Sequence, residues 1–301
     1  DRRVGLMSGE RGVYVDLTNA RDIDRLVKKH GFRFSKAMGQ NFLVDAEVPG
    51  KIAAGAGIDD SFGVLEIGPG IGALTGALSR HAGKVLSVEL DRRLLPLLRD
   101  TMAEFPNAKI LAGDILKLDI VKTVTAEMPG LRYAVCANLP YHITTPVLTA
   151  LIEAKIFETI TVMVQREVAL RMCAAPGTAD YGAFSVYISY HSEPRILFDV
   201  PPDSFIPRPK VTSSVITLKL RTSPPDGILD EALFFRVVRA SFAQRRKTLV
   251  NSLEAAFGGG FSKEELRQIV TDCGLDVMTR GEALDISGFA AVARRLGEKP
   301  V

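Results

Sequence analysis

The feature that most restricts the fold is a regular alternation of short β-rich runs with helical stretches between residues 63 and 220. Alternation of this kind indicates βαβ units, whose parallel strands form one open sheet with helices on its faces. Predicted parallel strands cover residues 63–68, 84–90, 108–114, 133–139 and 158–165. Two more runs, VYISYHS (186–192) and SSVITLKL (213–220), are predicted to form an antiparallel pair at one end of the sheet, separated by a loop. The sequence therefore predicts an α/β protein built on a wound, Rossmann-like sheet.

The segments outside this alternation have a different character. TSPPDG (222–227) contains a Pro-Pro-Asp-Gly run that is typical of a linker. The pattern after it is helical and offers no strand candidate, with helices predicted at 231–255, 262–273 and 287–296. A short amphipathic helix is predicted at 21–30. We therefore expect an N-terminal extension, a Rossmann-like domain and a small all-helical domain, at residues 1–45, 46–221 and 228–301.

Composition excludes several classes of protein. The chain has 301 residues, of which 47% are hydrophobic and 24% charged, as in globular proteins of one or two domains. Its three cysteines, Cys136, Cys173 and Cys273, are far apart and lack paired histidines, which argues against a zinc site or a disulfide framework. No apolar run reaches the roughly 18 residues that a membrane span needs. We expect a cytoplasmic protein of enzyme size that binds no metal and does not cross a membrane; the net charge of +3 indicates no partner by itself.

The first strand runs into a glycine-rich turn, VLEIGPGIGA (64–73). Glycines at this place let the backbone approach a ligand and let the next helix begin close to the sheet. Gly68-x-Gly70-x-x-Ala73 satisfies the loose NAD fingerprint, whereas an acidic residue two positions before Gly68 is more typical of S-adenosylmethionine sites. Glu66 has little use against a pyrophosphate but suits a cationic amino acid group. The turn therefore favours the methyl donor, with NAD and a ligand-free structural turn as alternatives.

The next two predicted strands also end in carboxylates. Glu89, in SVELD, comes about twenty residues after the glycine turn, where an acidic side chain can accept both hydroxyls of a ribose. Asp114, in AGDIL, is placed to accept from an adenine amino group. Successive strand ends line one crevice in open α/β sheets, and ligands bind there. We therefore expect one nucleoside-shaped site at this edge.

The fourth strand ends in Asn138, Leu139, Pro140 and Tyr141, beside the same crevice. Methyl transfer to an exocyclic amine is aided by acceptors for the two N–H bonds, and the Asn138 Oδ1 and Leu139 carbonyl oxygens are suitable. Pro140 stiffens the loop, and Tyr141 offers a face on which an unstacked base can lie. Alone, such an Asn is usually a turn former and such a Tyr a packing residue; beside the glycine turn, the combination favours base methylation.

A family resemblance follows from these motifs taken together. The chain resembles the ribosomal RNA adenine dimethyltransferases from about residue 24 to about residue 296. The motifs that carry the likeness are GQNFLVD (39–45), VLEIGPGIGALT, SVELD, GDIL, NLPY, QREVALRM (165–172) and FIPRPKVTSSV (205–215). AQRRKTLVNSL (243–253), together with Leu139, is more similar to the small-subunit branch than to the large-subunit enzymes. The first twenty residues have no counterpart in the family pattern.

The resemblance implies a class I S-adenosylmethionine-dependent methyltransferase fold with a small C-terminal all-helical domain. It implies dimethylation of the N6 amines of two adjacent adenosines near the 3′ end of small-subunit rRNA, in ribosome biogenesis. Gln40, Asn41 and Leu43 would close over the donor, with Gly68 against it. Asn138 would lie near the sulfonium and the target amine, and Tyr141 and Phe205 would stack the target adenine.

Basic residues gather at several places around the predicted pocket. No acid occurs between Glu231 and Glu254, a stretch predicted to be helical. The candidate RNA-binding residues are Arg208, Lys210, Arg236, Arg239, Arg245, Arg246 and Lys247. A basic helix face is more often only solvated, but basic groups at several pocket margins fit phosphate attraction. Because structured RNA is recognised mostly by shape, we expect the substrate to be rRNA in a pre-assembled ribosomal particle, bound by a monomer.

Three other functions stay open at this point. One is a catalytically idle rRNA-binding assembly factor, although such a protein would not need Glu89, Asp114 and Asn138 together. Another is a large-subunit rRNA adenine methyltransferase. The third is an NAD-dependent oxidoreductase, for which the sequence offers no catalytic His, Lys or Tyr-x-x-x-Lys, because none of its four histidines has a partner at useful spacing.

Overall fold

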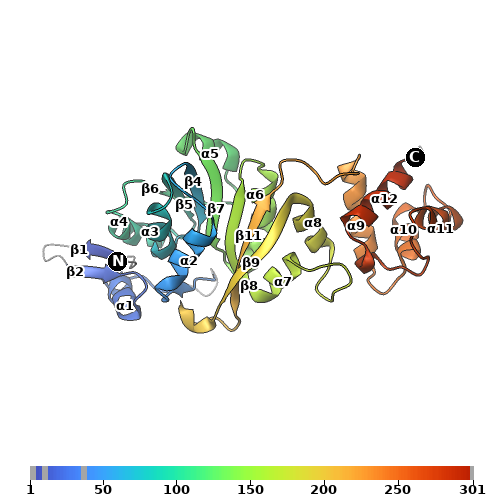
Figure 1. Cartoon of the computed structure of the whole chain (residues 1–301). Coiled ribbons are helices and arrows are strands. Elements are labelled where there is room, and N and C mark those ends of the chain that lie inside the picture. The colour runs from blue at the N-terminus through green and yellow to red at the C-terminus, as the bar shows by residue number, and fades with distance from the viewer. Residues whose placement is uncertain (1–4, 9–12, 35–38, 299–301) are drawn as a thin grey trace. The chain divides into compact units, whose positions relative to one another are not determined.

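The computed structural model describes residues 5–8, 13–34 and 39–298 (Figure 1). The chain divides into two compact units, residues 1–169 with 195–220 and residues 170–194 with 221–301. The second unit thus includes residues 170–194, which the sequence-based division placed in the Rossmann-like domain. Parts of the predicted N-terminal segment, residues 1–4, 9–12 and 35–38, lie outside the described residues.

The predicted mixed α/β architecture is confirmed by a seven-stranded sheet with the order β6-β5-β4-β7-β8-β11-β9. Its strands are β4 (Phe62–Ile67), β5 (Lys84–Glu89), β6 (Ala108–Ala112), β7 (Arg132–Asn138), β8 (Thr159–Gln165), β9 (Ser192–Val200) and β11 (Ser213–Leu220). Neighbouring strands from β6 to β8 pair in parallel, and β11 pairs antiparallel to β8. Two short sheets lie outside it, formed by β1 (Gly5–Ser8) with β2 (Val13–Asp16) and by β3 (Phe42–Leu43) with β10 (Phe205–Ile206).

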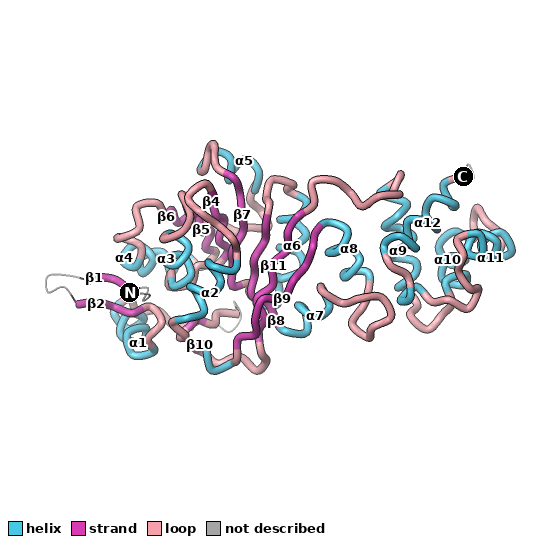
Figure 2. Tube along the Cα trace, in the orientation of Figure 1, coloured by secondary structure: helices cyan, strands magenta, loops and turns pink. Residues whose placement is uncertain are grey.

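The helices connect the strands and build most of the second unit (Figure 2). Those before β9 are α1 (Ala20–Lys29), α2 (Glu47–Gly55), α3 (Ala73–Ser79), α4 (Leu95–Thr101), α5 (Ile120–Glu127), α6 (Thr144–Glu153), α7 (Arg166–Met172) and α8 (Ala183–His191). Those after β11 are α9 (Glu231–Ala243), α10 (Leu249–Phe257), α11 (Lys263–Asp272) and α12 (Ile286–Gly297). Short 3-10 turns lie at η2 (Arg92–Leu94), η3 (Tyr141–Ile143), η4 (Pro202–Ser204) and η5 (Gly281–Ala283).

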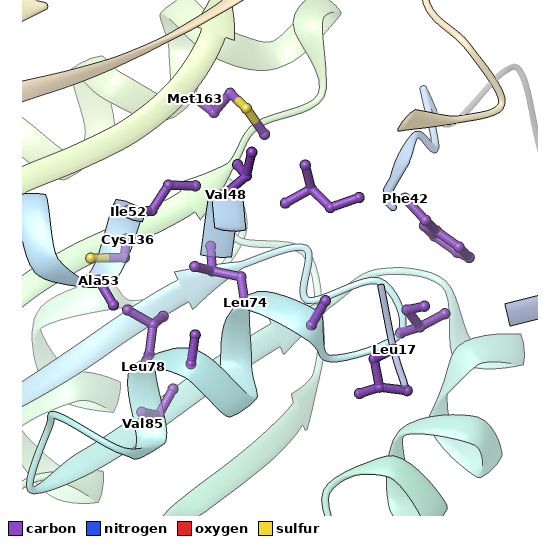
Figure 3. Packing of buried hydrophobic residues seen from close by; sticks show 14 of the residues in the cluster. Leu17, Phe42, Val48, Ile52, Ala53, Leu74, Leu78, Val85, Cys136 and Met163 are labelled. Carbon is purple, nitrogen blue, oxygen red and sulfur yellow. The ribbon is translucent and has the colours of Figure 1, made fainter. Parts of the chain in front are cut away.

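Each unit has its own apolar core. In the first unit, α2 and α3 pack one face of the central strands, where Leu74 and Leu78 of α3 share a buried cluster with Val85 and Cys136 (Figure 3). Strand β4 is buried along its whole length, as expected for a central strand of a parallel sheet. The second unit packs its helices around Phe234 and Phe289, both fully buried.

One predicted strand is wrong. VYISYHS was predicted as a strand because it is rich in β-branched and aromatic residues, but it forms the C-terminal part of α8 and the first residue of β9. The backbone N–H of Gly182 donates to Ser185 Oγ at the start of the helix, and Tyr190 packs on Phe234 with ring centroids 5.4 Å apart. The edge strand is instead β9, in the stretch predicted to be a loop. Tertiary packing outweighs the intrinsic β preference here.

The long helix predicted at 231–255 is also wrong, because it is broken in two. Helix α9 ends at Ala243, and α10 begins at Leu249 with Thr248 as its N-cap. The backbone N–H of Leu249 donates to the carbonyl of Thr279, which ties the break to a loop far away in the sequence. Arg245, Arg246 and Lys247 therefore lie in a turn and not on a helix face.

Candidate active site

The parallel register brings four strand ends to one edge of the sheet. Ile67 of β4 pairs with Val88 of β5 and with Ala137 of β7, and Glu89 pairs with Ala112 of β6. The loops that follow these strands surround a cavity of about 310 Å³. Of the predicted site residues, it is lined by Gln40, Asn41, Leu43, Glu66, Gly68, Gly70, Glu89, Asp114, Asn138, Leu139, Pro140 and Tyr141. The cavity has the size of a small-molecule site and lies where ligands bind in open α/β sheets.

The glycine turn forms the floor of this cavity. Gly68 and Gly72 have φ angles of 68° and 95°, in the left-handed region that side chains disfavour. A Cβ added at Gly68 would meet no atom within 4 Å, so the missing side chain leaves open space at the cavity wall. A Cβ at Gly72 would come within 2.4 Å of Met102 Cε, so that glycine lets α3 begin against α4. The two glycines thus serve ligand approach and helix packing, respectively.

Glu66 is a buried carboxylate beneath the turn. Its side chain is 1% exposed, and its Oε2 accepts hydrogen bonds from Thr75 Oγ1 and Ser87 Oγ, both at 2.6 Å. Burial raises the pKa of Glu66 to about 7, although the two hydroxyls lower it and Glu89 raises it further. The residue reaches the cavity wall, and a cation bound there would favour its charged form.

Glu89 ends β5 and is also largely buried. The backbone N–H of Asp91 donates to Glu89 Oε1 at 2.7 Å. Burial raises its pKa to about 7, against hydrogen bonds from backbone N–H groups that favour the charged form. Asp114, which follows the neighbouring strand β6, accepts from the backbone N–H of Leu116 at 3.1 Å and lies 3.7 Å from Lys117 Nζ. Both carboxylates are therefore held by local backbone donors before any ligand binds.

The two buried glutamates predict a pH-dependent stability. Each has a folded-state pKa of about 7, above the usual 4.5, so the folded protein retains protons that the unfolded chain releases. Stability is therefore greatest below about pH 4.5 for these groups and is lost as pH rises through 7, by up to roughly 3 kcal/mol for each.

Glu66→Gln should remove part of this decline, because a neutral amide can still accept from Thr75 and Ser87. Urea unfolding of both proteins at pH 5, 6, 7 and 8 measures the effect, without ligand. A decline of equal size in the variant would contradict a buried charge at Glu66.

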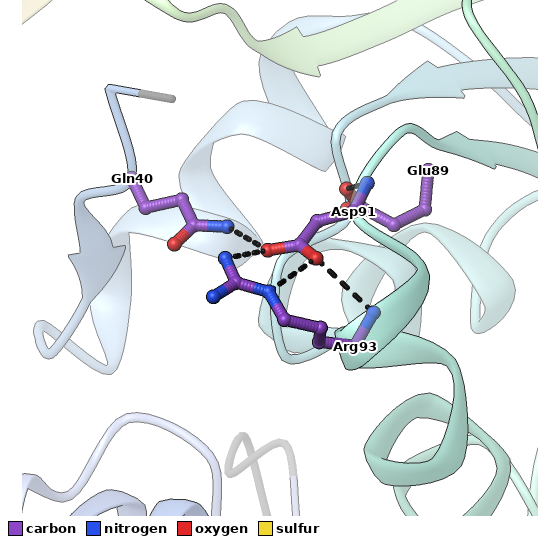
Figure 4. A network of polar contacts seen from close by, with 4 residues as sticks. All are labelled: Gln40, Glu89, Asp91 and Arg93. Atoms are coloured by element: carbon purple, nitrogen blue, oxygen red, sulfur yellow. Dashed lines mark hydrogen bonds and ion pairs between the residues drawn. The ribbon is translucent and has the colours of Figure 1, made fainter. Parts of the chain in front are cut away.

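A closing segment, residues 39–43, forms one wall of the cavity. Strand β3 within it pairs antiparallel with β10, placing Leu43 opposite Phe205. Asn41 Nδ2 donates to the Gly39 carbonyl, and Asn138 Nδ2 donates to the Asn41 carbonyl, both at 3.3 Å. Gln40 Nε2 donates to Asp91 Oδ2 at 2.9 Å, in the loop after β5 (Figure 4). Side chains from β7 and from the β5 loop thus hold the segment in place.

The loop that begins with Asn138 is fixed by several hydrogen bonds. Because Asn138 Nδ2 donates to the Asn41 carbonyl, its Oδ1 is left as the acceptor of the amide. The backbone N–H of Leu139 donates to the Met163 carbonyl at 3.2 Å, and the Pro140 carbonyl accepts from the backbone N–H of Ile143. The Tyr141 hydroxyl forms a 2.8 Å hydrogen bond with Ser213 Oγ of β11. The aromatic ring at the cavity is therefore anchored from a strand near the far edge of the sheet.

The structure does not bring Phe205 into the cavity. Its side chain is 3% exposed, packs in the first unit's core and belongs to β10 beside the closing segment. Three residues that sequence analysis did not single out lie outside the cavity lining and support it: Asp91, Arg93 and Ser213. Their signals were present, since Asp91 follows Glu89 in SVELD and Ser213 belongs to FIPRPKVTSSV. Only the fold shows what these side chains contact.

The predicted RNA-binding residues divide into two kinds. Arg236 donates to the Ala256 carbonyl at 2.8 Å and lies over the Phe257 ring, and Arg245 donates to the Ala179 and Tyr181 carbonyls. These two guanidinium groups fasten parts of the second unit to one another. Arg208 pairs with Asp203 at 2.9 Å. Residues with exposed side chains and no ion pair within the described part of the chain are Lys210, Arg239, Arg246 and Lys247.

Two features are absent from the described residues (5–8, 13–34 and 39–298). These residues contain no group of three or more His, Cys, Asp or Glu side chains placed to hold a metal ion. None of the helices in these ranges has both the length and the apolar character needed to cross a bilayer.

Comparisons with known proteins agree with this geometry. The family model described as ribosomal RNA adenine dimethylase matches residues 31–291. A ribosomal RNA small subunit methyltransferase A from Shouchella clausii is 43% identical over 93% of this chain and 96% of the relative. A ribosomal RNA small subunit methyltransferase A from a Geobacillus species is 45% identical over 90% of this chain and 94% of the relative.

Solved structures show the same fold. A dimethyladenosine transferase from Plasmodium falciparum superimposes with a TM-score of 0.71 at 24% identity, covering 85% of this chain and 97% of that one. The 23S rRNA methyltransferase ErmE superimposes with a TM-score of 0.66 at 26% identity, covering 85% of this chain and 100% of that one.

Proposed function

Because this chain belongs to the ribosomal RNA adenine dimethylase family, we propose that it dimethylates the N6 amines of two adjacent adenosines near the 3′ end of small-subunit rRNA. The methyl donor is S-adenosylmethionine, and the reaction is a step of ribosome biogenesis. The observation that carries the proposal is the meeting of Glu89, Asp114 and Asn138 around one cavity beside the glycine turn. The relatives named ribosomal RNA small subunit methyltransferase A support the small-subunit substrate over the large-subunit alternative.

The residues present fit the donor. When bound, S-adenosylmethionine supplies an electrophilic methyl group on positively charged sulfur. Glu89 is the acceptor for the ribose hydroxyls, and Asp114 is the acceptor for the adenine amine. The open backbone at Gly68 admits the amino acid end, where Glu66 balances its positive charge. The closing segment covers this end through Asn41 and Leu43.

Positioning of the target amine falls to the loop after β7. Asn138 Oδ1 and the Leu139 carbonyl accept hydrogen bonds from the two N–H groups of the adenine amine. This reduces delocalisation of the nitrogen lone pair into the ring and directs the lone pair at the methyl group. Tyr141, with its hydroxyl bound to Ser213, supports the flipped base by stacking. The buried Phe205 would have to become exposed to share this stacking, so its role rests on movement of β10.

Phosphate attraction is assigned to the exposed basic groups: Lys210 on the first unit and Arg239, Arg246 and Lys247 on the second. Arg208, Arg236 and Arg245 are already engaged with protein partners, so their contribution to RNA binding is indirect. The proposed substrate is rRNA within a pre-assembled particle, acted on in the cytoplasm by a monomer.

The turn between α9 and α10 gives a charge-reversal prediction. Replacing Arg246 and Lys247 together with Glu should weaken binding to small subunits about tenfold or more at low salt and reduce the slope of log K against log salt by about 2. Arg245→Met is the matched control: it should lower the melting temperature, because two carbonyls lose their donor, with little change in affinity of the folded protein. Filter binding over a salt series measures the affinity and its salt dependence for both variants, and thermal unfolding measures the melting temperature. Unaltered particle binding at low salt would show that this turn is not the RNA surface.

The test of the proposed function uses small subunits from cells that lack this modification. Incubation with labelled S-adenosylmethionine and mass analysis of the rRNA should locate two methyl groups on each of two adjacent adenosines. Absence of methyl incorporation into any RNA would favour the idle assembly factor, and labelling of large-subunit rRNA would favour the other branch of the family.

A further inference from the structure

The carboxylate of Asp91 is a junction between the closing segment and the β5 loop. The residue is 5% exposed, yet its charged carboxylate accepts four hydrogen bonds, one of them from the backbone N–H of Arg93 at 3.1 Å. Gln40 Nε2 donates to Oδ2 at 2.9 Å, while Arg93 donates to Oδ1 through Nε at 2.8 Å and to Oδ2 through a terminal nitrogen at 2.6 Å (Figure 4). Arg93 and Gln40 both hold the pKa of Asp91 below its usual value, with Arg93 the larger cause. The contact to Gln40 joins residues 51 positions apart in the chain.

The backbone of the same residue supports the site directly. Its N–H donates to Glu89 Oε1 at 2.7 Å, and Glu89 lines the cavity. One residue therefore touches the proposed ribose acceptor through its backbone and the closing segment through its side chain.

A second path leads from Asp91 to the closing segment. The Arg93 guanidinium, oriented by its two bonds to Asp91, lies 5.4 Å from the centre of the Phe32 ring. Phe32 stacks on Phe42 of β3, with centroids 6.0 Å apart and an interplanar angle of 23°. Asp91 thus contacts Gln40 of the segment directly and is linked to Phe42 of the segment through Arg93 and Phe32. Since β3 pairs with β10 over only two residues, these contacts add to the hydrogen bond from Asn138 to the Asn41 carbonyl in holding the segment.

We propose that Asp91 is a positioning residue for donor binding, whose carboxylate latches the closing segment through Gln40. The inference rests on the proposed function for its consequence, slower release of the donor, but the latch itself is a property of the free protein. A hydrogen bond to a charged carboxylate is stronger than one between neutral groups, which suits a contact that holds a short segment. Asp91 does not touch the reacting atoms in this assignment.

The first test needs no ligand. Gln40→Glu places a second carboxylate against Asp91, and the repulsion should open the segment. Amide hydrogen exchange at Val44 should then rise about tenfold or more, because Val44 donates to the Ser204 carbonyl only while β3 and β10 are paired. Adding Asp91→Asn should restore protection, since the new amide can donate to the introduced carboxylate.

Two controls separate a latch from a general loss of stability. Lys109→Gln breaks an exposed ion pair with Glu127 on the same unit and should leave exchange at Val44 unchanged. Exchange of the β4 amides should stay slow in every variant. If Gln40→Glu leaves Val44 protected, or if the double variant exchanges as fast as the single one, the latch is refuted.

The second test follows release of S-adenosylhomocysteine by stopped flow. Gln40→Ala should speed dissociation about tenfold and Asp91→Ala at least as much, with little change in the association rate, and the pair should act no more strongly than Asp91→Ala alone. Additive effects would refute the coupling. If the unaltered protein bound no S-adenosylhomocysteine, the proposed function would fail, and the exchange experiment would still decide the latch.

Discussion

Asn138→Ala is expected to reduce turnover by about 10²-fold or more, while donor affinity changes by less than about tenfold. The reason is that the nitrogen and the oxygen of this amide bind different partners. Nδ2 is occupied by the Asn41 carbonyl, so Oδ1 is left to grip the adenine amine, a contact that matters only when the base is in place. Single-turnover methylation of unmodified small subunits gives the rate, and calorimetry with S-adenosylhomocysteine gives the affinity.

Asn138→Asp is the control of matched size. It keeps acceptor oxygens but loses the N–H that the Asn41 carbonyl accepts, so its activity should fall between the alanine variant and the unaltered protein. Equal losses of turnover and donor affinity in Asn138→Ala would refute the amine-holding role and would make Asn138 a support for the closing segment.

Glu89→Ala should show the opposite pattern, with donor affinity reduced by at least about 10²-fold and the rate at saturating donor much less affected. A carboxylate that accepts two ribose hydroxyls makes two charge-assisted hydrogen bonds, each worth roughly 1.5–3 kcal/mol. Burial raises the pKa of Glu89 to about 7 in the free protein, so donor affinity should also increase with pH from 6 to 8. Calorimetry at three pH values measures both effects.

The matched probe for Glu89 is a donor product that lacks one ribose hydroxyl. The unaltered protein should bind it more weakly than S-adenosylhomocysteine, and Glu89→Ala should not distinguish the two. If the alanine variant still discriminates between them, another group holds the ribose.

The parallel part of the fold was predictable because its strands are short, buried and bounded by glycine or acidic residues. Strands β4, β5 and β7 lie within one residue of their expected ends, and the site residues at those ends converge on one cavity. Here local pattern and global fold agree, because a central parallel strand must be apolar along its whole length.

Prediction failed where local preference and tertiary packing disagree. Residues 186–191 have strand-like composition but form a helix, since Val186 and Tyr190 are needed in the core of the second unit. The turn at 244–248 carries no glycine or proline; the Leu249 N–H that follows it donates to the Thr279 carbonyl, a contact that no local pattern reveals. The two carbonyls that Arg245 binds were likewise not evident from the sequence, and its role in RNA binding stays a prediction.

The two-residue ladder between β3 and β10 has a consequence for repeated catalysis. Phe42 and Leu43 line the cavity, and Phe205 and Ile206 begin the stretch that contains Lys210, one of the proposed RNA contacts. On the proposed assignment, displacing β3 to exchange spent cofactor would also break or move β10. Exchange of cofactor between successive methyl additions would therefore be coupled to the contact with the nucleic acid.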